Sequence, residues 1–195
     1  MAETIETRPF PPFLPKKATV MMMGTFPPEQ SKRAMDSIIQ ISKMICACFG
    51  LVFFDEKDHF RNGEEKRWIL RRLKAFLSEA GIASCPTVLK AILEKGNASD
   101  AFLKVVEPVP LDDVLEQNPD CKHIGTTGGK ATEILLSLYQ KRLNYLNRVE
   151  TIPFVLNGRK LTLTRLPSTS RLSVEPTEKA EAYKNFFKAC GLKTK

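Results

Sequence analysis

An apolar run that ends in a stiff turn constrains this chain more than any other feature. The run extends from Ala18 to Met23 and is followed by Gly24-Thr25-Phe26-Pro27-Pro28. A strand buried on both faces has such a run, and strands of this kind are typical of parallel sheets. The two prolines fix two φ angles and remove two backbone donors. Because open α/β sheets bind ligands at the carboxyl ends of parallel strands, we expect a site here, with the Phe26 ring against a flat partner such as a nucleobase.

The length and the hydropathy pattern limit the possible classes of protein. A chain of 195 residues fits one domain with its own core. We expect residues 18–195 to form that domain and the Pro-rich residues 1–17 to form an arm that packs on it. No stretch approaches the roughly 18 apolar residues of a membrane span, and the N-terminal region lacks the apolar core of an export signal. These features predict a cytoplasmic protein without a membrane partner.

The cysteines and histidines do not form a recognisable metal pattern. Five cysteines are an odd number, and their spacings match no disulfide framework, zinc site or iron–sulfur motif. The two histidines, His59 and His123, are far apart in the sequence. We therefore expect reduced thiols, no metal and no cofactor.

The chain carries a formal net charge of +8. A basic surface favours polyanions, with nucleic acid as the first candidate. A generally basic soluble protein would have the same balance, so charge alone does not decide between these two interpretations.

Apolar periodicity and turn residues predict strands that alternate with helices, and hence an α/β fold. Helices are expected in part of 29–49, in 64–80 before Gly81, in 111–117, from Gly128-Gly129 onward, and after a cap at Thr177. Gly50 is expected to end the first helix. Strands are expected at 18–23, 51–54, 121–126, 151–156 and 159–166, the last two joined by a type I′ turn at Asn157-Gly158. Residues 82–97 are ambiguous.

Four short blocks carry a resemblance to a known family. They are Gly24-Thr25-Phe26-Pro27-Pro28, Asn97-Ala98-Ser99-Asp100, Thr126-Thr127-Gly128-Gly129-Lys130-Ala131 and Leu166-Pro167-Ser168-Thr169-Ser170-Arg171. In order and spacing they resemble motifs of the uracil-DNA glycosylase superfamily, nearest its mismatch-specific and hypoxanthine-DNA glycosylase branches. The resemblance covers roughly Pro9 to Leu192. It implies a three-layer α/β/α sandwich around a mainly parallel central sheet of about four strands.

The resemblance also implies an activity and a set of site residues. The family flips a damaged base out of DNA and breaks its N-glycosidic bond, and stacking plus phosphate contacts can offset the few kcal/mol that flipping costs. The implied base-binding residues are Gly24, Thr25, Phe26, Pro27, Asn97 and Thr127. The implied DNA phosphate and groove contacts are Pro167, Ser168, Thr169, Ser170 and Arg171.

Each implied role has a structural alternative. Phe26 is either a platform for the flipped base or a ring that fills its own core. The hydroxyls of Ser168, Thr169 and Ser170 contact phosphate or satisfy local backbone groups. Arg171 is a phosphate or groove ligand or a solvated surface residue, and Asn97 lines the pocket or caps a turn.

The chain departs from the family at the positions that activate water. Active relatives commonly have Asn or Asp in or shortly after the first block, where this chain has Pro27 and Pro28. Thr127 stands where the third block usually has Asn, and the apolar segment Ile38–Cys48 replaces a polar one. Asp55, Asp58 and His59 are weak candidates for the missing activator, since a general base needs a carboxylate or imidazole within reach. The alternative for them is a solvated turn.

The block from Thr126 to Lys130 also has features of a nucleotide phosphate loop. However, Ile124 stands where that motif requires its first glycine, and Ala131 where it requires Ser or Thr. Nucleotide hydrolysis is therefore not expected, although two glycines at a helix start can bind an anion through their amides.

Three functions stay open at this point. The first is a monofunctional DNA glycosylase that acts on uracil or hypoxanthine, and the second is a catalytically silent DNA- or lesion-binding module on the same fold. The third is an interaction or small-molecule protein that uses the Ile38–Cys48 segment as a packing or oligomer surface. The resemblance favours the first, with the second close behind.

Overall fold

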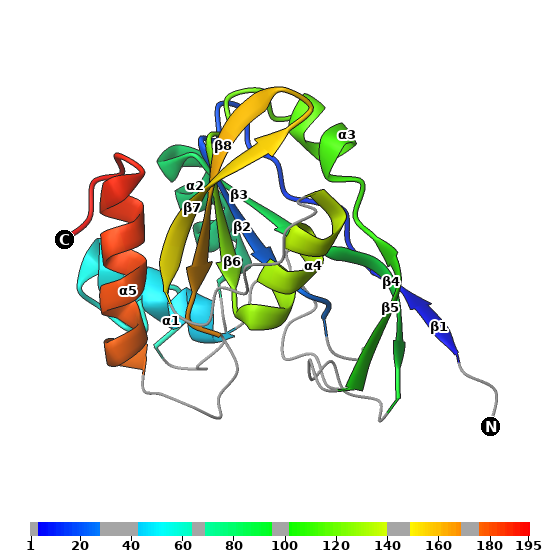
Figure 1. The fold of residues 1–195 in the computed structure, drawn as a ribbon. Coiled ribbons are helices and arrows are strands. Elements are labelled where there is room, and N and C mark those ends of the chain that lie inside the picture. Colours follow the sequence, from blue (N-terminus) through cyan, green and yellow to red (C-terminus); the bar gives the residue numbers. More distant parts are fainter. Residues whose placement is uncertain (1–3, 28–42, 64–68, 95–101, 140–148, 169–175) are drawn as a thin grey trace.

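The computed structural model describes residues 4–27, 43–63, 69–94, 102–139, 149–168 and 176–195, which form helices around two β-sheets (Figure 1). The strands are β1 (Ile5–Thr7), β2 (Val20–Gly24), β3 (Ile82–Pro86), β4 (Val88–Leu93), β5 (Leu103–Pro108), β6 (His123–Thr127), β7 (Glu150–Leu156) and β8 (Arg159–Leu166). The helices are α1 (Lys43–Phe54), α2 (Leu70–Ala80), α3 (Leu111–Glu116), α4 (Gly129–Tyr139) and α5 (Pro176–Ala189).

The central sheet is mixed, which corrects the expectation of a mainly parallel sheet of about four strands. Its five strands have the order β3-β2-β6-β8-β7. The first four are parallel to one another, and β7 is antiparallel to β8. The reason is the two-residue turn between β7 and β8, which can join only antiparallel neighbours. Asn157 and Gly158 have φ angles of 47° and 80°, as the predicted type I′ turn requires.

A second sheet, which the sequence did not predict, has the order β1-β4-β5 and is antiparallel throughout. It projects from the central sheet on the side where the chain begins (Figure 1). Residues 4–17 lead from the second sheet to the edge of the central sheet. β1 pairs with β4, and farther along Phe13 exchanges two backbone hydrogen bonds with Ser84 at the edge of β3, with N···O distances of 2.8 and 2.9 Å.

The β2 strand lies inside the central sheet, as its apolar run predicted. Its side chains alternate between the two faces of the sheet, as a pleated strand requires. Met21 and Met23 join a buried cluster with residues of α3 and α4, whereas Val20 and Met22 join one with residues of α1, α2 and α5. Helices therefore pack against both faces of this sheet, and the four parallel strands all end at the same edge.

Helix α1 corrects two expectations. Residues 51–54 are its last turn rather than a strand, and Gly50 lies inside the helix rather than after it. Residues 45–50 are all buried, because α1 is apolar around most of its circumference and packs between the sheet and other helices. A continuous apolar run such as this one shows neither the helical nor the strand period. The sequence pattern alone therefore could not distinguish a buried helix from a buried strand.

The remaining predicted helices are present with shifted boundaries. α2 ends at Gly81, whose φ of 70° and N–H bond to the Leu77 carbonyl form a left-handed cap. α5 begins at Pro176, so Thr177 is its second residue and not a preceding cap. In the part of the chain that the structure describes, no helix has both the length and the apolar character needed to cross a bilayer.

Gly50 provides a stability test of the α1 assignment. A Cβ atom at this position would lie 2.3 Å from the Glu56 carbonyl oxygen, because the chain turns back over the helix there. We expect Gly50→Ala to lower the free energy of unfolding by about 2–3 kcal/mol, the cost of forcing the turn apart. Urea denaturation measures this change.

Gly63→Ala is the matched control. A Cβ atom on Gly63 would meet nothing within 4 Å, so the substitution should change the free energy of unfolding by less than about 0.5 kcal/mol. If both substitutions changed the free energy of unfolding equally, the close turn of the chain over Gly50 after α1 would be wrong.

Candidate nucleic-acid site at the carboxyl edge of the sheet

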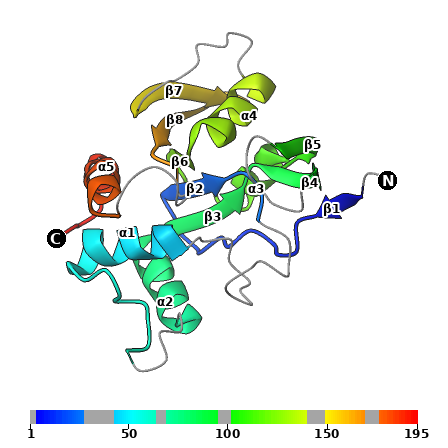
Figure 2. The same cartoon turned by 90° about the horizontal axis from the view of Figure 1, so that it is seen from below.

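Three of the sequence blocks meet where the parallel strands end. Gly24 ends β2, Thr127 ends β6 and Leu166 ends β8. The parallel register pairs Met23 with Thr126, and pairs Thr127 with Leu166. The segments that follow these strands therefore leave the sheet side by side, at the edge that faces the viewer in Figure 2.

Gly24 and Thr127 are direct neighbours. The Thr127 Oγ1 atom lies 3.3 Å from the point that a Cβ atom on Gly24 would occupy. It also contacts the Met23 carbonyl oxygen at 3.5 Å, the weak limit of a hydrogen bond. A hydroxyl that can both donate and accept thus lies next to a residue without a side chain.

The exit of β2 continues beside the segment that links β3 to β4. The Thr87 N–H donates to the Gly24 carbonyl at 2.7 Å, and the Val88 N–H donates to the Thr25 carbonyl at 3.3 Å. These bonds hold the turn in place. They also occupy one lone pair on each of these two carbonyls.

Phe26 lies in the core. Its side chain is 7% exposed and packs with a buried cluster that joins the second sheet to α4. The buried partners are Val88, Ala91, Leu103 and Ile134. Base stacking by Phe26 stays a prediction, and it requires the ring or this cluster to move.

The turn from β6 into α4 is held by a network of threonines. Thr126 Oγ1 lies 2.7 Å from Thr132 Oγ1, and the Thr132 hydroxyl donates to the Gly128 carbonyl at 2.9 Å. Gly128 has a φ of 111°, a conformation that only glycine adopts readily. Its N–H donates to the Leu166 carbonyl at 3.1 Å, which joins this turn to the end of β8.

The segment after β8 is anchored from α5. The buried Tyr183 hydroxyl donates to the Pro167 carbonyl at 2.9 Å. Ser168 lies beside Gly128, with its Cβ 3.3 Å from the point that a Cβ on the glycine would occupy. Pro167 is thus held by α5 and Ser168 lies beside the start of α4, while phosphate contact by this segment stays a prediction.

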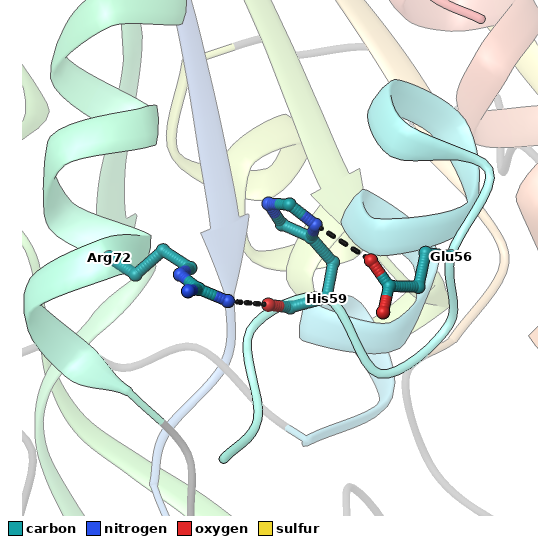
Figure 3. Close-up of polar contacts among 3 residues, drawn as sticks. All are labelled: Glu56, His59 and Arg72. Atoms are coloured by element: carbon teal, nitrogen blue, oxygen red, sulfur yellow. Dashed lines mark hydrogen bonds and ion pairs between the residues drawn. The ribbon is translucent and has the colours of Figure 1, made fainter. Parts of the chain in front are cut away.

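The loop after α1 has its own internal contacts (Figure 3). His59 Nδ1 lies 3.0 Å from Glu56 Oε2, and the Arg72 guanidinium donates to the His59 carbonyl at 2.7 Å. The His59 ring stacks on Phe54 with 3.7 Å between centroids, and Asp58 pairs with Arg61 at 3.1 Å. Asp55 has a left-handed φ of 58° just after the helix.

This loop is remote from the strand ends. Figure 2 shows it at the outer end of α1, beside α2 and away from the central strands. Its contacts explain how the turn is stabilised, and a catalytic role for Asp55, Asp58 or His59 stays a prediction.

Several predicted residues lie outside the described part of the chain. These are Asn97, Thr169, Ser170, Arg171, Pro28 and the first part of the Ile38–Cys48 segment. The described part of that segment is in the core: Ile45, Cys46 and Cys48 are at most 4% exposed. An oligomer surface at this position is therefore weakened as an interpretation.

Sequence reasoning missed three residues at this edge, namely Thr87, Arg165 and Tyr183. Arg165 lies on the same face of β8 as Leu161 and Leu163, whose side chains are in the core. In the sequence, a cation at an alternating position that is otherwise apolar could have indicated this residue. Thr87 and Tyr183 carry no comparable local signal.

Four of the five thiols are buried, and that of Cys190 is half-buried. Among the described residues, no group of three or more His, Cys, Asp and Glu side chains could hold a metal ion. Burial raises the pKa of Cys46 and Cys85 to about 12 and that of Cys48 to about 11. Thiols of this kind stay protonated near neutral pH and are poor nucleophiles and ligands.

These pKa shifts predict a loss of stability in alkaline solution. The folded state keeps its thiol protons up to about pH 12, whereas an unfolded thiol releases its proton near pH 9. The contribution of these thiols to the free energy of unfolding is therefore complete below pH 9. It falls as the pH rises to about 12, by about 1.4 kcal/mol per pH unit for each such thiol. Urea denaturation at successive pH values measures this slope.

A double substitution tests the assignment of that slope. The Cys46→Ala/Cys85→Ala variant should lose stability at every pH through its cavities, but it should show a shallower fall above pH 9. An unchanged slope would show that these thiols are not the groups responsible.

Comparison with known proteins identifies the fold. No protein-family model matches the chain, and no curated protein matches its sequence. Its structure is similar to a solution NMR structure described as "a putative Uracil DNA glycosylase from Methanosarcina acetivorans", with a TM-score of 0.62 and 16% sequence identity. The match covers 96% of this chain and 99% of that chain. At this identity the likeness concerns the fold, and the chain has the mixed α/β fold of that protein.

Proposed function

We propose that this chain is a uracil-DNA glycosylase-like protein of base-excision repair, which hydrolyses the N-glycosidic bond of a flipped deaminated base, uracil or hypoxanthine. One observation carries the proposal. Three sequence blocks that resemble motifs of this superfamily, around Gly24, Thr127 and Pro167, meet at one edge of a sheet in a chain with a matching fold. Open α/β sheets bind their ligands at this edge.

The proposal assigns a task to each part of the edge. A duplex lies across the edge, and the positive charge of the chain favours this approach. The Pro167-Ser168 segment contacts the strand, and the flipped base enters beside Gly24 and Thr127. Backbone groups and the Thr127 hydroxyl bind the edge of the base, because a hydroxyl can both donate and accept.

The reaction is a hydrolysis at the anomeric carbon of the sugar. The bond from that carbon to the base nitrogen breaks, and the base leaves with the electron pair and takes up a proton. Water supplies the oxygen that replaces it and releases a proton. Phosphates near the sugar stabilise the positive charge that develops there.

The proposal also includes the finer architecture. Helices on both faces of the central sheet support a three-layer α/β/α arrangement. Residues 18–195 form a single domain, and the pairings of β1 and Phe13 support an arm of residues 1–17 that packs on it.

A second candidate is a catalytically silent module that binds DNA or its lesions on the same fold. The segments Gly24–Pro27, Thr127–Lys130 and Leu166–Ser168 contain no Asp, Glu or His. The acidic loop after α1 lies at the outer end of that helix, away from the central strands. A general base must lie within hydrogen-bond reach of the water that it activates, and this composition favours binding without turnover.

A glycosylase assay separates these two candidates. The protein is incubated in excess with duplexes that carry one uracil or one hypoxanthine, and alkali then cleaves the strand at abasic sites. We expect abasic product from at least one duplex and none from an undamaged control duplex. Salt-sensitive binding without product would reject hydrolysis and support the silent module.

Thr127→Val tests the proposed base contact. This substitution removes a hydroxyl with only a 3.5 Å contact to Met23, so the folded state should lose little stability. We expect product formation, or binding to the damaged duplex if there is no turnover, to fall about tenfold, because a base edge is left with an unmet hydrogen bond.

Thr162→Val is the matched control. The Thr162 hydroxyl bonds to His123 at 2.8 Å near the opposite end of the sheet. The control variant should react and bind as the unmodified protein does. Equal losses in both variants would show that the effect comes from stability and not from a base contact.

A further inference from the structure

The N-terminal arm brings an arginine to the carboxyl end of β3. The arm runs antiparallel to β3 where Phe13 bridges to Ser84, so Arg8, which precedes Phe13 in the chain, lies toward the end of that strand (Figure 2). The Arg8 N–H donates to the Leu89 carbonyl at 2.9 Å, and the Arg8 Nη1 atom lies 4.0 Å from the Cys85 Sγ atom. Cys85 is the penultimate residue of β3, which ends in register with β2. Arg8 therefore lies at the same edge as the candidate site.

The surroundings of Arg8 supply no anion to its guanidinium. The Cys85 thiol is a weak acceptor at the distance limit of a hydrogen bond, and burial raises its pKa to about 12, so it stays protonated and uncharged. Glu6 is two residues earlier in the arm and does not pair with Arg8, and Glu107 of β5 is paired with Lys90 at 2.6 Å. Within the described part of the chain, the half-buried guanidinium forms no ion pair.

The pairings on both sides of Arg8 hold its backbone in place. β1 pairs with β4 immediately before it, and Phe13 exchanges backbone hydrogen bonds of 2.8 and 2.9 Å with Ser84 after it. A cation whose backbone is already ordered loses less entropy when it binds a ligand. A guanidinium also presents a planar fork of donors that matches the oxygens of a phosphate. Arg8 is therefore suited to bind an anion that approaches the carboxyl edge.

We propose that Arg8 binds a backbone phosphate of the DNA, on the β3 side of the position where the flipped base enters. The inference rests on the proposed function and extends it, because it makes the N-terminal arm part of the DNA-binding surface. A phosphate at this position supplies the opposite charge that the guanidinium does not find in the described part of the protein.

The strand order places this contact opposite the one proposed for the segment after β8. In the order β3-β2-β6-β8, the ends of β2 and β6 lie between Arg8 and the Pro167-Ser168 segment. The ends of β3 and β8 are three strand spacings apart, roughly 14 Å, which matches the rise of about four nucleotides of a duplex strand. The two contacts therefore hold the duplex on both sides of the flipped nucleotide.

Arg8→Gln tests the inference, with Arg71→Gln as the matched control. Arg71 is an exposed arginine of α2, whose core residues Leu73 and Leu77 pack on the opposite face of the sheet from Cys85. Binding of each variant to a short duplex with one uracil is measured between about 50 and about 200 mM salt. We expect Arg8→Gln to bind about tenfold more weakly at about 50 mM salt. The slope of log affinity against log salt concentration should be shallower by about 0.9, because one phosphate contact is lost.

The outcomes separate this inference from the proposed function. Arg71→Gln should bind as the unmodified protein does, and Arg8→Lys should keep part of the affinity, because lysine keeps the charge without the fork. If the unmodified protein binds DNA and Arg8→Gln binds equally well, the inference is overturned while the proposed function stands. Equal losses in Arg8→Gln and Arg71→Gln would assign the effect to net charge and would also overturn it. If the unmodified protein does not bind DNA, both fail together.

A chemical measurement on the unmodified protein covers the case in which Arg8→Gln displaces the arm. Phenylglyoxal modifies accessible guanidinium groups, and peptide mass spectrometry locates each modified residue. DNA should slow the modification of Arg8 and leave that of Arg71 unchanged. Equal rates for Arg8 with and without DNA would overturn the inference.

Discussion

The parallel pairing of β2 with β3 and β6 is the constraint on which the candidate site depends. Val20 to Met23 are at most 3% exposed, so their backbone groups have no water to bond and must pair with a strand on each side. A slip of one residue would turn every β2 side chain to the opposite face, so the packing of both apolar clusters depends on this register. This register brings Gly24 to Thr127 across more than a hundred residues of sequence.

The features that the sequence predicted well are those with a local physical signal. The Asn157-Gly158 turn, the left-handed cap at Gly81 and the amphipathic face of α2 each follow from a few adjacent residues. α1 was partly misassigned because a helix buried on all sides has no polar face to give it a period. The second sheet was missed because the pairing of β1 with β4 joins segments far apart in the chain.

The candidate site shows the same division. The sequence blocks identified the three segments that meet at the carboxyl edge, because each contains glycine or proline at a strand end. Side chains outside these blocks were harder to find. Arg165 lies inside a strand, and only the position of Gly129 on a different element shows where its guanidinium goes.

The position of Phe26 affects how this edge can recognise a base. Burial of a phenylalanine stabilises a protein by about 1.5–3 kcal/mol, and stacking on a base is worth about 1–3 kcal/mol. Moving the ring out of its cluster to stack would exchange two terms of similar size and add little affinity. In its buried position the ring instead ties the exit of β2 to the second sheet and to α4. Under the proposed function, recognition then falls to groups that need no such movement, such as the Thr127 hydroxyl beside Gly24, and Phe26 contributes by holding the turn that presents it.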